Sequence, residues 1–189
     1  MLPSATLAKT ERSTADESAD LAVVFWRFAA GESPALAQLY DLCAAELYGL
    51  ALWRCGSRPE AEDAVQEVFV RLATTTADLS RVRNPRAYLL TMARRAACDL
   101  LHRRHPGEPL GELVVAEEAT DPAVAVDAER ASHQLRQLPA AQREAIYLRH
   151  FAGLTFAEIG AVTGVPKFTA ASRCRNGLDR LRALLGVEL

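Results

Sequence analysis

Several features that define large classes of proteins are scarce or missing in this sequence. No stretch approaches the ~20 uncharged apolar residues that a membrane span requires. No basic segment followed by an apolar core marks a secretion signal at the N-terminus. Only 6% of the residues are aromatic, which together with abundant Ala, Leu and Arg favours helices over sheets. The sequence therefore predicts an all-α protein of the cytoplasm that does not insert directly into a membrane.

Signatures of catalysis and of metal binding are missing as well. The chain has four histidines and four cysteines, but none of them shows the close pairing typical of metal ligands. We find no glycine-rich loop that would cradle a phosphate and no nucleophile motif. The pattern around Cys43, Cys55, Cys98 and Cys174 predicts small buried apolar side chains, with a regulatory thiol as the alternative. We expect no enzyme, no catalytic residue, no metal and no cofactor.

Charge is nearly balanced over the whole chain but not along it. The formal net charge is −2. Seven arginines against Asp99 give residues 81–104 a charge of +6, and five basic residues against Asp179 give residues 167–182 a charge of +4. Between these blocks, seven acids against Arg130 give residues 105–130 a charge of −6. Because basic clusters attract phosphate, the two blocks favour a nucleic-acid partner, with solvated helix faces as the alternative.

Breaks in the apolar periodicity divide the chain into four parts. Residues 1–20 lack any apolar period and predict a disordered tail. Residues 21–104 predict a domain of four helices, over about 21–30, 34–55, 59–74 and 85–104, with Ser33 and Asn84 as caps. Residues 105–126 hold three prolines and most of the acidic block over 105–130, which predicts a flexible acidic linker with a reach of ~70 Å. Residues 127–189 complete a second small helical domain.

The second domain has the pattern of a helix-turn-helix module. Thr155 and Glu158 form a capping box that opens a short helix, and this helix ends at Gly164. A tight turn and a basic helix over about 168–185 follow. In DNA-binding modules of this form the second helix lies in the major groove; a plain helical hairpin is the alternative. The polar residues that would meet DNA are Lys167, Thr169, Ser172, Arg173, Arg175 and Asn176.

These motifs resemble those of bacterial sigma-70-family factors of RNA polymerase. The segments LPAAQREAI at 138–146 and GLTFAEIG at 153–160 resemble domain four of the family. AEDAVQEVF at 61–69 resembles the polymerase-binding helix of domain two, and NPRAYL at 84–89 resembles the start of its promoter-melting helix. Two such domains with no third between them are typical of the extracytoplasmic-function (ECF) group. The resemblance covers about residues 21–185 and implies a factor that directs core polymerase to promoters and assists DNA opening.

The resemblance also implies partners and site residues. The partners are core RNA polymerase, through its β′ and β subunits, promoter DNA and an anti-sigma factor. The polymerase-binding residues are Asp63, Gln66, Glu67 and Val70. The residues for the −10 promoter element are Arg81, Arg83, Asn84, Arg86, Tyr88, Arg94, Arg95, Arg103 and Arg104. Tyr88 is equally suited to the core, and the basic helix would recognise the −35 element.

The last helix departs from the family pattern. Phe168-Thr169-Ala170-Ala171-Ser172-Arg173 stands where the family often has Gly-Thr-Val-Lys-Ser-Arg. We therefore expect either a −35 preference particular to this chain, with Phe168, Ala170 and Ala171 as its source, or weaker binding at that element. Further along, Gly177 costs the helix ~1 kcal/mol relative to Ala.

Two other functions remain open at this point. One is a sigma-like protein that binds an anti-sigma factor without contacting DNA, and the other is a freestanding helix-turn-helix regulator. The arginine clusters argue against the first and the polymerase-binding stripe against the second. A further hypothesis is that the linker acids Glu108, Glu112, Glu117 and Glu118 contact the basic blocks within the chain.

Overall fold

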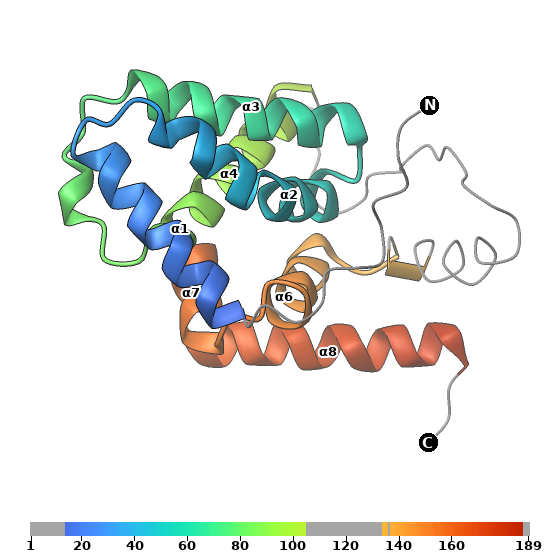
Figure 1. Cartoon of the computed structure of the whole chain (residues 1–189). Helices are drawn as coiled ribbons and strands as arrows, with labels where there is room; N and C mark the ends of the chain where they lie inside the picture. Colours follow the sequence, from blue (N-terminus) through green and yellow to red (C-terminus); the bar gives the residue numbers. More distant parts are fainter. Residues whose placement is uncertain (1–13, 105–133, 136, 187–189) are drawn as a thin grey trace, which may run out of the picture.

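The computed structural model describes residues 14–104, 134–135 and 137–186, and all regular elements in these ranges are helical (Figure 1). The first domain consists of α1 (Thr14–Ala29), α2 (Ala35–Cys55), α3 (Arg58–Thr74), a 3-10 turn η1 (Leu79–Arg81) and α4 (Pro85–Arg104). The second consists of α6 (Ala140–His150), α7 (Phe156–Thr163) and α8 (Lys167–Leu185). The predicted all-α class is confirmed. The linker over 105–126 lies outside the described residues.

The first helix is longer than the apolar pattern predicted. It begins at Thr14 rather than near Leu21, so residues 14–20 are helical and do not belong to a disordered tail. Periodicity missed this extension because the added turns carry polar and charged side chains.

Caps at the other helix ends largely follow the sequence. Asn84 Oδ1 accepts a hydrogen bond from the Ala87 backbone N–H at 3.0 Å, which fixes the start of α4. Gly56 ends α2 with φ +74°, a left-handed conformation that suits glycine. The expected Ser33 cap of α2 was wrong, because the residue before the helix is Pro34 and no side chain caps it.

The core of the first domain forms where α3 packs against α2 and α4. The apolar stripe that periodicity predicted on α3 is confirmed and is fully buried: Ala61, Ala64, Val65, Val68 and Leu72. On α4, Leu89 and Ala96 are buried, whereas Met92 and Leu100 are only partly so. Since each buried Val or Leu side chain contributes about 1.5–3 kcal/mol, this stripe fixes which face of α3 points outward.

The cysteines mostly pack as small apolar side chains. Cys43, Cys55 and Cys174 are buried and Cys98 is half-buried. Burial raises the pKa of the Cys43 and Cys55 thiols to about 12, so both stay protonated at neutral pH. Within the described ranges, no helix is both long enough and apolar enough to cross a bilayer.

The predicted capping box of α7 is confirmed. Thr155 Oγ1 accepts a hydrogen bond from the Glu158 N–H at 3.3 Å, and the Glu158 carboxylate accepts one from the Thr155 N–H at 2.9 Å. Gly164 ends the helix with φ +73°. A Cβ on Gly160 would lie 2.6 Å from the Val165 carbonyl oxygen, so the turn between α7 and α8 requires glycine at this position. The helix-turn-helix geometry is therefore fixed by local chemistry.

Gly177 lies where α8 crosses α6. A Cβ there would lie 2.9 Å from Ile146 Cδ1 and 3.1 Å from Gln142 Cβ. The residue that looked unfavourable for helix formation therefore allows the two helices to approach closely.

We expect Gly177→Ala to destabilise the second domain. Overpacking a core position typically costs about 1–3 kcal/mol, which exceeds the ~1 kcal/mol that alanine returns in helix propensity. Urea unfolding followed by circular dichroism measures the free-energy change. Ala183→Gly, at an exposed site on the same helix, should show the propensity effect alone. A Gly177→Ala protein that is more stable than the parent would contradict the close-approach explanation.

The two domains pack directly against one another. Helix α6 lies against α2, and α7 lies against α4, whereas α8 contacts only α6 and α7 among the described elements. Leu148, Ala152 and Ile159 of the second domain join the same buried cluster as Leu47 and Leu50 of the first. Helix α8 consequently lies on the side of the molecule away from α3 (Figure 1). We call this packing of the two domains the closed arrangement.

Candidate functional site

The predicted polymerase-binding residues lie together on the outer face of α3. Asp63, Gln66 and Val70 are exposed, and Glu67 is half-buried. The Glu67 carboxylate pairs with Arg71 at 2.7 Å, and Arg71 also lies 3.5 Å from Asp99 of α4. Because the opposite face of α3 is buried in the core, this face is available to a partner.

Beside this face, α2 and α3 enclose an open groove of about 430 Å³. Its lining combines aromatic, small and polar side chains: Tyr40, Ala44, Ala45, Tyr48, Glu62, Val65 and Gln66. Tyr40 is 50% exposed, and the centroid of its ring lies 4.9 Å from the centroid of the Phe69 ring. The sequence predictions missed the α2 side of this surface. The signal was the spacing of Tyr40, Ala44 and Tyr48, four residues apart on one helix face.

Several of the arginines predicted to contact the −10 element lie in the open. Arg81, Arg83, Arg95 and Arg103 are exposed. Arg81 pairs with Asp78 at 3.1 Å, in a solvent-exposed contact that water and salt weaken. A phosphate can therefore replace Asp78 as its partner at little cost. The side chain of Arg104 lies outside the described part of the chain.

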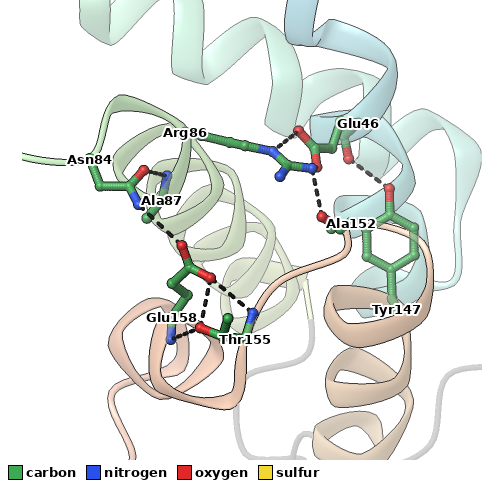
Figure 2. A network of polar contacts seen from close by, with 8 residues as sticks. All are labelled: Glu46, Asn84, Arg86, Ala87, Tyr147, Ala152, Thr155 and Glu158. Carbon is green, nitrogen blue, oxygen red and sulfur yellow. Dashed lines mark hydrogen bonds and ion pairs between the residues drawn. The ribbon is translucent and has the colours of Figure 1, made fainter. Parts of the chain in front are cut away.

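Arg86 and Asn84 instead hold the two domains together (Figure 2). Arg86 Nε donates to Glu46 Oε2 of α2 at 3.1 Å, and its Nη2 donates to the Ala152 carbonyl oxygen of the second domain at 2.6 Å. Asn84 Nδ2 donates to Glu158 Oε1 of α7 at 3.5 Å. Both residues at the start of α4 are thus engaged by the second domain.

Arg94 is half-buried and is engaged in the same way, by a buried carboxylate of the second domain. Its Nε lies 2.8 Å from Glu144 Oε1 of α6, and Arg54 Nη1 of α2 lies 3.8 Å from the other carboxylate oxygen. Glu144 is only 1% exposed, so its charge requires both arginines as compensation. Arg143, next to Glu144, donates to the Trp53 carbonyl oxygen near the end of α2.

A close backbone approach completes the contact between the domains. The Tyr147 hydroxyl donates to the Glu46 backbone carbonyl oxygen at 2.9 Å, and burial raises the pKa of Tyr147 to about 12. A Cβ on Gly49 would overlap that hydroxyl, so α6 can reach α2 only at a glycine.

The structure favours the core alternative for Tyr88. Its ring packs edge-on against Phe25 of α1 at 6.0 Å between centroids, and it lies against the main apolar cluster. The linker acids proposed to contact the basic blocks lie outside the described residues. The acids that do contact Arg86, Arg94 and Asn84 are Glu46, Glu144 and Glu158.

The predicted −35 residues lie on α8, which the first domain does not contact. Lys167, Arg175 and Asn176 are exposed, and Thr169, Ser172 and Arg173 are half-buried. Ala170, Cys174 and Gly177 are the buried positions of the helix. The face opposite them carries Phe168, Ser172, Arg175 and Asn176, following the helical period. The closed arrangement thus engages three of the predicted −10 residues and leaves the outward face of α8 open.

The capping box lowers the pKa of Glu158 below its ordinary 4.5, chiefly through hydrogen bonds from Thr155. A lowered pKa means that the ionised form stabilises the fold above the ordinary value, and this contribution is lost as pH falls through the lowered one. We expect the Glu158 carboxyl group of Thr155→Val, followed by NMR during a pH titration, to have its titration midpoint at a higher pH than in the parent protein. Thr163→Val at the other end of α7 should leave it unchanged. Equal midpoints in all three proteins would contradict the assignment.

Family models match both domains of the chain. A model described as Sigma-70 region 2 matches residues 39–106, and one described as Sigma-70, region 4 matches residues 134–183. The first match contains the α3 face, the groove and the start of α4. The second contains the helix-turn-helix module.

Relatives match over nearly the whole chain. The chain is similar to the ECF RNA polymerase sigma factor SigK of Mycobacterium ulcerans, with 30% identity over 89% of this chain and 95% of that protein. SigK of Mycobacterium tuberculosis (strain H37Rv) is 28% identical over 90% and 96%. Among solved structures, the sigma factor RpoE of Bartonella quintana, in complex with the anti-sigma factor NepR, matches with a TM-score of 0.67 and 25% identity, covering 81% of this chain and 98% of that one. CnrH in complex with the cytosolic domain of CnrY shares the fold, with a TM-score of 0.64 and 22% identity over 88% and 97% of the two chains.

Proposed function

The chain belongs to the ECF group of sigma-70-family RNA polymerase sigma factors, and from this premise we propose which of its surfaces bind polymerase, promoter and regulator. A sigma factor directs polymerase to specific promoters at the start of transcription, and this is the function of the chain. In the proposed role the chain positions core polymerase and DNA, and this role requires no reaction catalysed by the chain itself. The observation that carries the assignment of surfaces is the separation of an exposed face on α3 from the exposed basic helix α8.

The outer face of α3 and the α2–α3 groove form the proposed docking surface for core polymerase. Asp63, Gln66, Glu67 and Val70 supply a polar face with one apolar residue, and Tyr40 and Tyr48 extend it onto α2. Tyrosines in a groove are typical anchors of protein interfaces. We assign this surface to the β′ subunit, as the family resemblance implies, with the β subunit contacting the second domain.

The turn between α3 and α4 and the start of α4 form the proposed −10 surface. The exposed cations Arg81, Arg83 and Arg95 suit the phosphates of a displaced strand. Asn84 and Arg86 would complete this surface once the second domain leaves them. We leave Tyr88 out of this surface, because its half-buried ring packs against the apolar core.

Promoter binding therefore requires the closed arrangement to open. In the closed arrangement the second domain contacts Asn84 through Glu158, Arg86 through the Ala152 carbonyl oxygen, and Arg94 through Glu144. The three side chains cannot keep these contacts while they bind DNA. In the opened chain α8 would bind the −35 element at a distance from the first domain. Opening exposes Glu144 to water, which removes the desolvation cost of its charge.

An anti-sigma factor is the proposed regulator of this opening. The similar sigma factor RpoE of Bartonella quintana was solved in complex with the anti-sigma factor NepR. A partner that covers the α2–α3 groove while both domains remain packed would block polymerase and the −10 contacts together. The exposed apolar side chains near that groove, Tyr40 and Val70, suit a partner with an amphipathic helix.

In vitro transcription with bacterial core polymerase over a promoter library tests the function. We expect initiation from a subset of promoters that share two sequence elements, and no selectivity from core polymerase alone. Asp63→Arg, which reverses one charge on the docking face, should reduce transcription from that subset. A chain that binds an anti-sigma factor but supports no specific initiation would instead be a sigma-like decoy. Specific duplex binding without polymerase would indicate a freestanding regulator.

A further inference from the structure

Phe168 is the most exposed large apolar side chain among the described residues, with 77% of its surface in water. It is the second residue of α8, on the outward face that also carries Ser172 and Asn176, four and eight residues further along. An exposed ring contributes little to the stability of the fold. A role for this ring is therefore sought in a contact with a partner, and its position on the helix indicates which partner. That position is the N-terminal turn of the proposed recognition helix.

The structure separates the three residues in which α8 departs from the family pattern. Ala170 is 1% exposed and packs with the cluster that contains Ile159, so it cannot contact a base. This corrects the expectation that Ala170 contributes directly to promoter preference. Ala171 is half-buried and carries only a methyl group. Phe168 is the departure that projects outward.

We propose that Phe168 contacts the 5-methyl group of a thymine in the major groove of the −35 element and makes the chain prefer thymine there. Thymine is the only base with a methyl group in that groove, and apolar side chains such as Phe make this contact. Residues at the N-terminal end of a recognition helix are those that meet base edges. The inference rests on the proposed role of α8 in −35 binding.

The surroundings of the ring suit a groove lined by phosphates. The Lys167 ammonium lies 4.9 Å from the centroid of the Phe168 ring, a cation–π contact that restrains the ring. The same lysine and the exposed Arg175 place positive charge along the edge of the helix beside the ring, where backbone phosphates would lie. Apolar contact and phosphate contacts thus come from adjacent residues.

The experiment removes single methyl groups from the DNA. Holoenzyme made with the whole chain first selects −35 sequences from promoter duplexes randomised at that element. The recovered duplex is then synthesised with each thymine replaced in turn by deoxyuridine, which lacks only the methyl group. We expect about a fourfold loss of affinity at one position, the size expected for one buried methyl group. Phe168→Ala should bind that duplex less tightly and lose the difference between thymine and uracil.

Controls separate this inference from the function on which it rests. Leu185→Ala truncates an apolar residue at the far end of the same helix and should keep the methyl dependence. Thermal unfolding of Phe168→Ala checks that the exposed substitution leaves the fold intact. Failure to select any −35 sequence contradicts the proposed function. A selected element with no methyl dependence, or with equal dependence in Phe168→Ala, overturns this inference alone, as does a Phe168→Ala defect confined to core-polymerase binding.

Discussion

Replacing Glu144 with glutamine is expected to open the closed arrangement. The substitution leaves Arg54 and Arg94 in a buried contact without the negative charge that compensates them. Removing one partner of a buried ion pair typically costs 3–5 kcal/mol, which corresponds to at least about a hundredfold decrease in the equilibrium constant between the closed and the open arrangement. Energy transfer between labels on the two domains measures the separation. Each domain should keep its helices, because the lost contact lies between them.

Two further variants make this prediction specific. Arg54→Met removes the partner from the other domain and should open the chain as well. Glu32→Gln removes an exposed carboxylate that pairs with Arg27 at 2.8 Å within the first domain and should leave the separation unchanged, since surface pairs contribute at most about 1 kcal/mol. If Glu144→Gln and Glu32→Gln behave alike, the buried ion pair does not hold the domains together.

Replacing Val70 with glutamate is expected to abolish tight binding of core polymerase. Val70 is 57% exposed on the proposed docking face, so the substitution puts a charge into the interface without disturbing the core. Losses of about 2 kcal/mol or more are typical when a central interface position is disrupted, so we expect at least about thirtyfold weaker binding. Titration of labelled protein with core polymerase measures the dissociation constant.

The chain offers a matched control for this substitution. Val23 on α1 is 59% exposed and lies outside the α2–α3 groove, so Val23→Glu introduces the same charge at the same exposure. We expect its affinity for core polymerase to stay within about twofold of the parent. Equal losses in both variants would indicate a general effect of charge on the first domain rather than a docking site on α3.

Local chemistry explains why much of the fold could be predicted from the sequence. The Thr155–Glu158 capping box and the Gly164 stop depend on residues within a few positions of one another, and both were confirmed. The buried stripe on α3 follows from helical periodicity alone. Gly177 could not be explained by local rules. It is unfavourable for the helix propensity of α8, and only the proximity of α6 explains why glycine is present there.

The contacts between the domains could not be predicted in this way. Glu144 lies in a segment that resembles a family motif, and in the sequence it looks like any glutamate of a helix. Its partners Arg94 and Arg54 are 50 and 90 residues away in sequence. Nothing in a local pattern pairs it with Arg54 and Arg94. For the same reason the resemblance and a positive charge alone predict that Arg86 contacts DNA, whereas the structure places it between Glu46 and Ala152. Long-range pairing determines which cations are free.

The central claim of this account is that the closed arrangement and promoter binding compete for the same side chains at α4. The direct measurement is the distance between labels at Ala30 and Ala183, which are exposed and outside the proposed contacts. Noncanonical amino acids can carry the labels without touching the native cysteines. We predict one short distance in the free chain and a longer one in the complex with core polymerase and promoter, with free Glu144→Gln shifted toward the longer value. An unchanged distance in the promoter complex would contradict the claim.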